Sequence, residues 1–520
     1  MNEHLFGTAR WAEAGDLASA RLIETPRPSP DALILGKTVN WMSNRGPHPF
    51  ERCWQLCSPI GNDTSSTYLQ TQGEGHVITV APTRSGKGVG SIIPNLLNWR
   101  GPAVVSDPKG ENYVLTSQYR RAVLGQHIWC FDPYLEVARR SSRFATLARI
   151  KRLYNCLGTI NEAMAGDLMA EAARIAEAIV IRPKDEKDPF FNTAAQAMIK
   201  AAIILTCYRY ENFACPPISK IRDLLLDHEE MAKLKAELER KIEHSNGREV
   251  QKYALLLKSV DEYEAYVDNR DVRATVAMQT EFLEDRGVAD MLDADNGHGA
   301  SDVFDPQEML RQDDNSVYIV IPPRHLSRQV RTIRLILSGM LDETMRGNPT
   351  RETHRTHSRT LFLLDEVGQF GPLDPLRKAV TLGAAYGAIL WMFWQDVAQL
   401  KRVYPEDWSS FLSNSCVQQF FGCNDMGTAE MVSKRCGLKF APNVMLNDGI
   451  ASRGMFSDVN HQMTQFGMPI ELIRQYEVVR ACPEIVFTFK QGTFPILVRR
   501  ISYYSDRLFQ QRQQTASRMT

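Results

Sequence analysis

The sequence lacks any excess of charge of one sign, because 61 lysines and arginines balance 61 aspartates and glutamates. A globally basic nucleic-acid binder is therefore excluded, and any contact with nucleic acid must be local, for example inside a channel. Zinc-site signatures are lacking as well, since the ten cysteines form no C-x-x-C pair and no Cys/His cluster at zinc spacing. They are interpreted as scattered buried thiols in a reducing cytosol.

Two weaker pairs of potential metal ligands lead to no metal prediction. Cys53 and Cys57 are interpreted as a coincidence of spacing. His354 and His357 lie in a polar, arginine-rich loop, where solvation is expected. The sequence therefore predicts no metal centre built from cysteine or histidine.

Long apolar runs are lacking too. No stretch reaches the roughly 18 apolar residues needed to span a bilayer, and Met1 begins no signal peptide. The longest apolar windows, residues 201–207 and 388–394, have the size of core segments. We therefore expect the chain as given to be soluble, and its 520 residues predict two or three domains.

The most informative stretch is residues 81–88, Ala-Pro-Thr-Arg-Ser-Gly-Lys-Gly, which follows the apolar run 76–80 and opens into a helical stretch over 89–97. A strand, a Gly/Ser-rich turn, a lysine and a helix form the layout of a phosphate-binding loop, where backbone N–H groups surround an anion. The match to G-x4-G-K-[ST] is imperfect, because Ala81 replaces the first glycine and Gly88 the Ser/Thr. A plain strand–turn–helix connection is the alternative.

A pair of acids follows a second apolar run. Residues 360–364, Thr-Leu-Phe-Leu-Leu, precede Asp365 and Glu366, which fits a buried parallel strand with two carboxylates at its C-terminal edge. In this setting the aspartate would hold Mg2+ through water, and the glutamate would activate the attacking water. Strand ends often carry acids, so the prediction of nucleotide hydrolysis depends on pairing this edge with Lys87.

Another strand, residues 388–394, ends at Gln395. A glutamine at the tip of the strand beside the acidic one can sense the terminal phosphate and report hydrolysis to a neighbouring surface. A polar strand terminus without function is the alternative.

Strands and helices alternate on both sides of a central block. We expect strands over 102–106, 126–131, 315–321 and 417–421, with helices over 112–124 and 329–346. This alternation predicts an α/β fold with a mostly parallel sheet covered by helices on both faces. Residues 485–489 and 495–498 are predicted as an edge hairpin, and the tail after Asp506 as polar and frayed.

Between about 157 and 300 the pattern is helical, with almost no strand signal. Apolar residues recur at three- and four-residue spacing, and charged helices are expected over 220–242, 248–269 and 269–292. The predicted organisation is a flanking segment over 1–75, a nucleotide-binding domain over 76–156 and 301–505, an inserted all-α domain over 157–300 and a polar tail over 506–520.

At this point a set of motifs, taken together, resembles the VirD4/TraG family of type IV coupling proteins, ATPases that feed DNA or protein substrates into conjugative type IV secretion systems. The matching stretches run in order along most of the chain. They are residues 4–11 (His-Leu-Phe-Gly-Thr-Ala-Arg-Trp), 81–90 with 93–97, 106–111 (Ser-Asp-Pro-Lys-Gly-Glu), 188–192 (Asp-Pro-Phe-Phe-Asn), 364–366, 395–400 and 420–425 (Phe-Phe-Gly-Cys-Asn-Asp).

The resemblance implies a RecA-like P-loop NTPase with an inserted all-helical domain, assembled as a hexameric ring with a channel for single- or double-stranded DNA. It implies ATP and Mg2+ as cofactors, with catalytic roles for Lys87, Asp365, Glu366 and Gln395 and the metal held by Asp365. The ATP phosphates would be bound by Thr83, Arg84, Ser85, Gly86, Lys87, Gly88 and Val89.

The implied partners are DNA, a relaxase or relaxosome or effector proteins, and the inner-membrane components of the secretion channel. The helical domain would face the cytoplasm and receive the substrate. The chain would be cytoplasmic and docked at the inner membrane, although members usually begin with a transmembrane region that is absent from this sequence.

Two further departures concern the site. Gly88 is familiar in this family, but it removes a Mg2+ ligand that must then come from elsewhere. Ala384 stands 11 residues before Gln395, where the family often has an arginine finger, and Arg377 or Lys378 could substitute for it. The loss of a finger lowers hydrolysis by orders of magnitude, so nucleotide binding is predicted more firmly than fast turnover.

Three functions remain open at this point. The first is an ATP-driven coupling protein that recruits and pumps a nucleoprotein substrate. The second is a substrate receptor or assembly platform that binds ATP but hydrolyses it weakly. The third, a chromosomal DNA translocase on a similar motor core, is disfavoured by the full set of motifs.

Overall fold

The computed structural model describes residues 9–38, 67–141, 153–157, 168–183, 186–211, 216–293, 303–307, 314–346, 359–445 and 464–518. The sites considered above at Cys53, Cys57, His354 and His357 lie outside these residues. The chain divides into two compact units. The first unit comprises Met1–Asn98 and Phe393–Arg507, and the second comprises Trp99–Met392 and Leu508–Thr520.

The first unit contains a sheet in the order β1-β3-β2-β16-β15-β12-β4. Only β12 and β4 pair in parallel in this part of the sheet; the other neighbours are antiparallel. The strands are β1 (Leu22–Thr25), β2 (Leu33–Lys37), β3 (Tyr68–Thr71), β4 (His76–Val80), β12 (Ser415–Phe420), β15 (Ile485–Lys490) and β16 (Ile496–Arg499).

The predicted strand over 76–80 and the predicted edge hairpin are both confirmed, the latter as the antiparallel pair β15 and β16. The sequence analysis assigned no strand to the first 75 residues, whereas β1, β2 and β3 extend the sheet there. These strands are four or five residues long. Such short strands are stabilised mainly by their neighbours in the sheet, so a local pattern does not reveal them.

The helices of the first unit are α1 (Ala14–Ser19), α3 (Ile93–Leu96), α17 (Val397–Val403), α18 (Trp408–Ser413), α19 (Met426–Cys436) and α20 (Gln475–Arg480). A separate antiparallel hairpin joins β13 (Leu438–Met445) to β14 (Thr464–Glu471). A wide, π-type turn over Gly88–Ile92 leads into α3. A regular α-helical bond cannot form across this junction, because Pro94 has no N–H to donate to the carbonyl of Gly90.

The second unit contains a fully parallel sheet in the order β11-β10-β5-β9-β6. Its strands are β5 (Ala103–Ser106), β6 (His127–Phe131), β9 (Asn315–Ile319), β10 (Thr360–Leu364) and β11 (Ala388–Trp394), whose last two residues belong to the first unit. Every residue of β5, β9, β10 and β11 is buried. The predicted parallel sheet is therefore confirmed, and its continuous apolar strands are typical of a sheet covered on both faces.

Helices α4 (Glu111–Ala122), α5 (Glu136–Arg140), α15 (Pro323–Met345) and α16 (Asp374–Leu382) belong to this unit. Arg120 on α4 is fully buried and donates to the carbonyls of Trp99 and Gly101 and to the hydroxyl of Ser316 on β9. Burial lowers the pKa of this guanidinium to about 10. The side chain thus ties α4 to the start of β5 and to β9.

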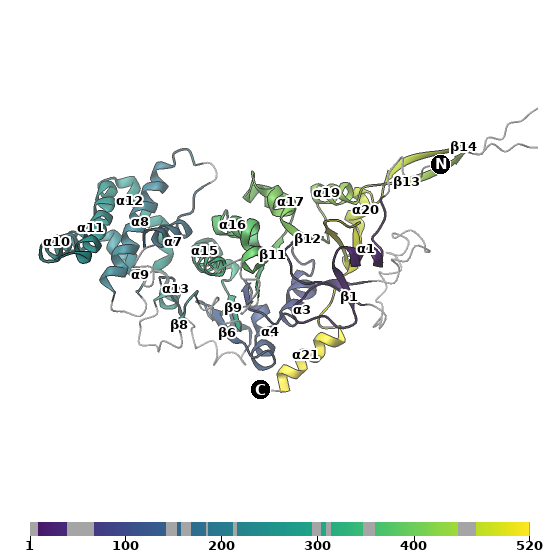
Figure 1. The fold of residues 1–520 in the computed structure, drawn as a ribbon, viewed down its shortest axis with the longest axis horizontal. Coiled ribbons are helices and arrows are strands. Elements are labelled where there is room, and N and C mark those ends of the chain that lie inside the picture. The colour runs from purple at the N-terminus through teal and green to yellow at the C-terminus, as the bar shows by residue number, and fades with distance from the viewer. Residues whose placement is uncertain are drawn as a thin grey trace, which may run out of the picture. The chain divides into compact units, whose positions relative to one another are not determined.

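A bundle of helices is inserted between β6 and β9, as the teal cluster in Figure 1 shows. It comprises α7 (Leu168–Ile179), α8 (Phe190–Arg209), α9 (Ser219–Leu226), α10 (His228–His244), α11 (Arg248–Val267), α12 (Arg270–Thr280) and α13 (Arg286–Leu292). At its root the short strands β7 (Leu153–Tyr154) and β8 (Val303–Phe304) pair in parallel. The predicted helical character is confirmed for the described residues of this block.

Two helix predictions were wrong. Residues 269–292 do not form a single helix, because the chain breaks at Asp285, whose carboxylate caps the start of α13. Residues 220–242 do not form a single helix, because the chain breaks between α9 and α10 at Asp227, whose backbone is extended. The Asp227 carboxylate accepts from the N–H groups of Glu229 (3.0 Å) and Glu230 (3.2 Å). An aspartate that caps a helix start satisfies donors that would otherwise lack a partner, and this capping competes with helix continuation.

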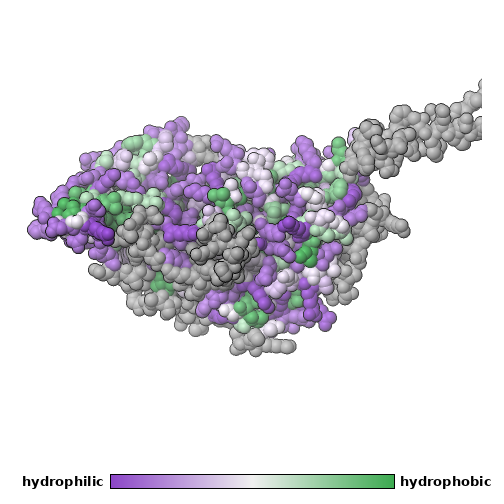
Figure 2. Space-filling model, viewed as in Figure 1, coloured by the Kyte–Doolittle hydropathy of each residue, from purple (hydrophilic) through white to green (hydrophobic). Residues whose placement is uncertain are grey.

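Helix α8 is the one helix among the described residues that is long and apolar enough to cross a membrane by length and composition. Its apolar window is 67% buried inside the structure, as expected of a core helix. On the face seen in Figure 2, hydrophilic residues predominate and apolar residues are scattered. None of the seven described cysteines forms a disulfide, and four of them are buried as predicted, whereas Cys130, Cys416 and Cys482 are half-buried.

The prediction of a frayed tail after Asp506 was wrong, since Arg507–Arg518 forms α21, the yellow helix in Figure 1. Phe509 and Ala516 are seven residues apart and both are buried. Residues at this spacing share one face of a helix. The burial of this sparse apolar face, rather than the polar composition, decides the structure of the segment.

Asn95 joins α3 to β2 in the first unit. Its fully buried side chain accepts from the N–H of Ile34 (2.8 Å) and donates to the carbonyls of Ile34 (3.0 Å) and Ser91 (2.8 Å). Asn95→Ala should lower the free energy of unfolding by about 2–4 kcal/mol, because buried backbone groups lose their partner. Urea denaturation monitored by circular dichroism measures this loss.

Asn414→Ala is the matched control. Asn414 is exposed and bonds only locally, to the carbonyl of Ser410. Its removal should change the free energy of unfolding by less than about 0.5 kcal/mol. Equal effects of the two substitutions would contradict a structural role of Asn95.

Candidate functional site

The predicted phosphate loop turns sharply after β4. Arg84 and Gly86 both have left-handed backbones, with φ of 65° and 91°. The N–H of Ser85 donates to the carbonyl of Pro82 (3.3 Å), and the N–H of Gly90 donates to the carbonyl of Gly86 (2.9 Å). A tight turn that enters a helical turn in this way directs successive N–H groups to one side, as an anion-binding loop requires.

Lys87 stands at the start of the wide turn and is only 6% exposed. Thr83 and Arg84 are exposed, whereas Ser85, Gly86, Gly88 and Val89 are half-buried. A buried lysine at the N-terminal end of a helical turn adds positive charge where backbone donors already favour an anion.

The end of β11 lies beside the start of this loop, within the same unit. The N–H of Ala81 donates to the carbonyl of Trp394 (2.9 Å), so Gln395, the next residue, lies beside the start of the loop. The backbone N–H of Gln395 donates to the side-chain oxygen of Gln399 (3.0 Å). Asp396 caps α17 by accepting from the N–H of Gln399 (2.6 Å). The structure therefore brings together the phosphate loop and the predicted sensor glutamine.

Gly422, in the segment after β12, explains part of the motif at 420–425. Its backbone is left-handed (φ 61°), and a Cβ there would stand 3.3 Å from the Cβ of Ser85. The glycine lets this segment approach the phosphate loop closely, and the carboxylate of Asp425 then caps α19 by accepting from the N–H of Thr428 (2.7 Å).

Arg500 was missed by the sequence analysis. It follows β16 and donates from Nη1 to the carbonyl of Ser85 in the loop. Its stem and guanidinium fill the space left by Gly86 and Gly90, so a Cβ on either glycine would collide with it. Its Nε is buried and bonds to no described residue, and burial lowers the pKa of the guanidinium. Arg500 therefore braces the loop from its own unit.

The predicted acid pair lies in the second unit, at the carboxyl end of β10. Asp365 and Glu366 are half-buried, and the N–H of Glu366 donates to Oδ1 of Asp365 (3.1 Å). The hydroxyl of Ser106, at the end of the neighbouring strand β5, donates to the carbonyl of Asp365 (3.3 Å). Parallel pairing of β5 with β10 thus places the motif at 106–111 beside the acid pair.

Asp107 adds a third carboxyl group at this edge. Burial raises its pKa to about 7, although the N–H groups of Tyr113 and Asn112 act in the opposite direction. Oδ2 of Asp107 accepts from the N–H of Tyr113 (2.8 Å). The first role of this side chain is therefore to hold the start of α4 against the end of β5.

The finger candidates also lie in the second unit. Ala384 is exposed in the short turn Gly383–Tyr386. Arg377 on α16 donates to Oδ1 of Asp374 (3.2 Å), and Lys378 beside it is exposed. Lys87, the phosphate loop and Gln395 are thus parts of the first unit, whereas Asp365, Glu366 and the finger candidates are parts of the second.

The residues of the loop fit a nucleotide phosphate. A Cβ on Gly88 would meet no atom within 4 Å. The space that a Ser or Thr side chain would occupy at this position of the G-x4-G-K-[ST] motif is therefore open. No group of three or more His, Cys, Asp or Glu residues able to hold a metal occurs among the described residues.

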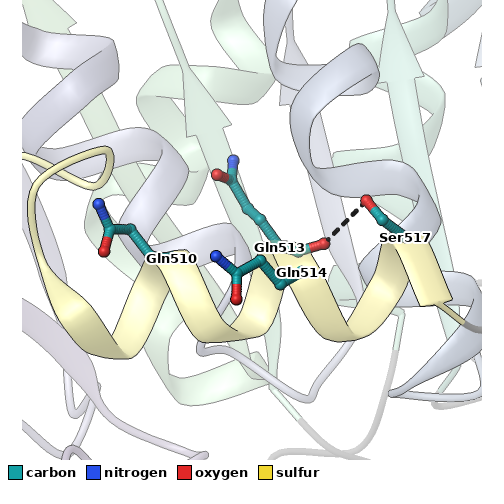
Figure 3. A pocket seen from close by; sticks show the side chains of 4 residues that line it. All are labelled: Gln510, Gln513, Gln514 and Ser517. Carbon is teal, nitrogen blue, oxygen red and sulfur yellow. Dashed lines mark hydrogen bonds between the residues drawn. The ribbon is translucent and has the colours of Figure 1, made fainter.

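Two hollows elsewhere lack this chemistry. One of about 420 Å3 is lined by Gln510, Gln513, Gln514 and Ser517 on α21 (Figure 3), and these four side chains carry no charge. The other, of about 800 Å3, lies among α8, α9 and α10. Its lysine and arginine are paired, Arg209 with Glu230 and Lys220 with Asp223, each at 2.7 Å.

Comparison with known protein families decides the classification. The model of the family described as "Type IV secretory system Conjugative DNA transfer" matches residues 10–520. This chain belongs to that family. Its membership confirms the predicted resemblance to the VirD4/TraG coupling proteins.

Individual members of the family are similar over much of the chain. Protein VirD4 of Rhizobium rhizogenes is 28% identical over 516 residues, which cover 98% of this chain and 67% of the relative. Conjugal transfer protein TraG of Escherichia coli is 28% identical over 446 residues, covering 84% of this chain and 65% of the relative. The chain spans about two thirds of the length of these relatives.

Solved structures confirm the fold class. The unbound monoclinic form of the bacterial conjugative coupling protein TrwBdeltaN70 matches with a TM-score of 0.55 and 12% identity, covering 82% of this chain and 84% of that chain. Plasmid coupling protein TrwB in complex with ADP and Mg2+ matches with a TM-score of 0.51 and 12% identity, covering 83% and 85%. The chain therefore has the RecA-like P-loop NTPase fold predicted for this family.

The contact between Arg500 and the loop predicts a suppression effect. Gly90→Ala should destabilise the protein by about 1–3 kcal/mol, because the new methyl group overpacks the stem of Arg500. In an Arg500→Ala background the same substitution should cost clearly less, since the colliding side chain is gone. Urea denaturation of the two single variants and the double variant measures the coupling.

Gly15→Ala serves as the control, because a Cβ on Gly15 meets no atom within 4 Å. Gly15→Ala should behave alike in both backgrounds. Strictly additive effects of Gly90→Ala and Arg500→Ala would refute the packing described here.

Proposed function

We propose that this chain is the motor of a type IV coupling system, which binds and hydrolyses ATP to deliver DNA–protein or protein substrates to a secretion channel. Membership of the conjugative DNA transfer family over residues 10–520 carries the proposal. The half-buried loop with Lys87 at the start of a helical turn supports it chemically. The complex of TrwB with ADP and Mg2+ shows that a protein of this fold holds such a ligand.

In this proposal residues 83–89 bind the ATP phosphates through backbone N–H groups, and Lys87 neutralises the outer phosphates. When bound, Mg2+ would neutralise charge on the phosphate oxygens, with Asp365 as its protein ligand. Glu366 accepts a proton from the attacking water, and Gln395, beside the start of the loop, senses the terminal phosphate.

The assembly and partners are proposed on the same basis. The chain belongs to the conjugative DNA transfer family, and we propose, as the family resemblance implies, a hexameric ring of copies around a DNA channel, docked at the inner membrane beside the secretion channel. The all-α insertion over 157–300 then receives the relaxase-bound DNA or effector protein. A balanced net charge suits sequence-independent contacts confined to a channel lining.

Substitution of the loop lysine and the water-activating acid tests the proposed motor. Lys87→Ala should lower ATP turnover by at least about 10²-fold by weakening phosphate binding and transition-state neutralisation. Glu366→Gln should lower turnover by about 10²-fold or more while ATP binding persists, because the amide cannot accept the proton. Phosphate release with and without single-stranded DNA, together with titration of a fluorescent ATP analogue, separates the two effects.

Lys434→Ala is the control, because Lys434 is an exposed lysine of the first unit whose partner is Glu430 (2.6 Å). It should leave turnover unchanged. Wild-type turnover no greater than that of Lys87→Ala, with and without DNA, would exclude the motor.

A weakly hydrolysing substrate receptor is the second candidate function. Two observations favour it, the glycine at position 88 and the exposed Ala384 at the position of the family's finger. Binding of substrate protein or DNA that is unaffected by Lys87→Ala, together with negligible turnover, would select this function over the motor.

The open space at Gly88 leads to a gain-of-function prediction. Gly88→Ser should fit without a clash and supply a hydroxyl ligand for Mg2+, tightening Mg-ADP binding about fivefold, or ~1 kcal/mol. Isothermal titration with Mg2+ and with EDTA measures the difference. The gain should vanish in EDTA, and equal or weaker binding of the variant in Mg2+ would contradict the assignment of the loop.

A further inference from the structure

The backbone just after the acid pair is held in an unusual conformation. Glu366 has a left-handed φ of 56°, which non-glycine residues seldom adopt. A short turn over Val367–Gln369 follows, in which the N–H of Gln369 donates to the carbonyl of Glu366 (2.9 Å). Such a conformation persists only where the surrounding structure imposes it. The direction of the Glu366 side chain therefore depends on what holds residues 367–372.

A buried arginine from α15 holds this segment. Arg334 is 5% exposed, and its Nη1 donates to the carbonyls of Phe370 (3.3 Å) and Pro372. Its Nε donates to the carbonyl of Ala178 (3.1 Å), near the end of α7 in the helical insertion. One planar, permanently charged group thus joins the segment after the acid pair to the inserted helices.

One turn earlier on α15, Arg331 contacts the insertion at a second point. Its Nε and Nη2 both donate to Oε1 of Gln279 on α12 (3.1 and 2.7 Å). The fully buried Gln279 amide also accepts from the N–H of Ile181 and donates to its carbonyl. It donates as well to Oδ1 of Asn192 (2.9 Å). Asn192 is the last residue of the motif at 188–192, which the proposed site leaves without a role.

We propose that Arg334 is a positioning residue for Glu366, and that Arg331 and Gln279 make its position depend on the arrangement of the inserted helices. The inference rests on the proposed function, since it takes Glu366 as the group that activates water. Arg331 and Arg334 are three residues apart and so lie on neighbouring parts of one helix face. A shift of α7 or α12 relative to α15 withdraws an acceptor from one of these guanidinium groups.

The physical reason for coupling is the burial of the charge. A desolvated guanidinium must keep its acceptors, so loss of the Ala178 carbonyl forces Arg334 to reorient. The carbonyls of Phe370 and Pro372 then lose their donor, and the turn that imposes the conformation of Glu366 loosens. In this way substrate docking on the helical insertion regulates hydrolysis without touching the nucleotide.

Steady-state kinetics provide the first test. Arg334→Gln should lower kcat on the order of 10²-fold by misplacing Glu366, while KM and the Kd of a non-hydrolysable ATP analogue stay within about twofold. Arg334→Lys should recover part of kcat, because lysine keeps the positive charge but lacks the several fixed N–H donors of the guanidinium. Arg328→Gln is the matched control, since Arg328 lies on the same helix with a side chain 79% exposed and 3.5 Å from Glu281.

Hydrogen exchange provides a second test that needs no nucleotide. Backbone amides of residues 366–371 should exchange faster in Arg334→Gln and also in Arg331→Gln, and they should exchange at the wild-type rate in Arg328→Gln. Arg331 donates to Gln279 on α12, an element of the insertion, so its effect on this segment reports the coupling. Should Arg334→Gln fail to fold, Arg334→Lys and Arg331→Gln carry the test.

The outcomes separate this inference from the proposed motor. Wild-type kcat together with wild-type exchange at residues 366–371 in the Arg334 variants would overturn the positioning role. Faster exchange in Arg334→Gln but not in Arg331→Gln would overturn the coupling to the helices. A wild-type protein without ATP turnover would overturn the proposed motor, and the exchange experiment would still decide whether Arg334 holds the segment.

Discussion

Parallel pairing of buried strands is the constraint on which the candidate site depends. In the first unit, β4 and β12 end at the same edge, which brings Gly422 against the phosphate loop. In the second unit, β5 and β10 end together, which places Ser106 and Asp107 beside Asp365. Because the carboxyl ends of parallel strands share one edge, every motif that follows such a strand gathers there.

Buried arginines organise the segments that follow these strands. Arg500 braces the phosphate loop, Arg120 ties α4 to β5 and β9, and Arg334 holds the segment after Glu366. Each guanidinium donates to at least one backbone carbonyl that ordinary secondary structure leaves without a donor. A planar group with five donors suits this role, because several carbonyls can be held by one rigid side chain.

The helical insertion and the acid pair are joined by α15 within the second unit. This helix packs against α7 and α16, and it carries Arg331 and Arg334 between Gln279 and the segment after Glu366. The insertion is thus attached to the α/β part by a buried polar network as well as by the paired strands β7 and β8. Few conformations of such a buried network satisfy all its hydrogen bonds. A movement of the inserted helices would therefore change the contacts of the segment after Glu366.

The sequence by itself determined the strands β4 to β6, β9 to β12, β15 and β16, the helical insertion, the phosphate loop and the acid pair, because apolar periodicity and loop chemistry are local properties. It did not reveal the two small pairs, β7 with β8 and β13 with β14. It also revealed the family, through motifs spread along the chain. Tertiary structure alone decided the strands β1 to β3, the ordered helix α21 and the break at Asp227. It alone revealed Arg500 and Arg334 as well, since Arg500 contacts Ser85 across 415 positions of the chain. Contacts between residues so far apart in the sequence form only when folding brings a buried guanidinium beside a backbone carbonyl. No local sequence pattern predicts them.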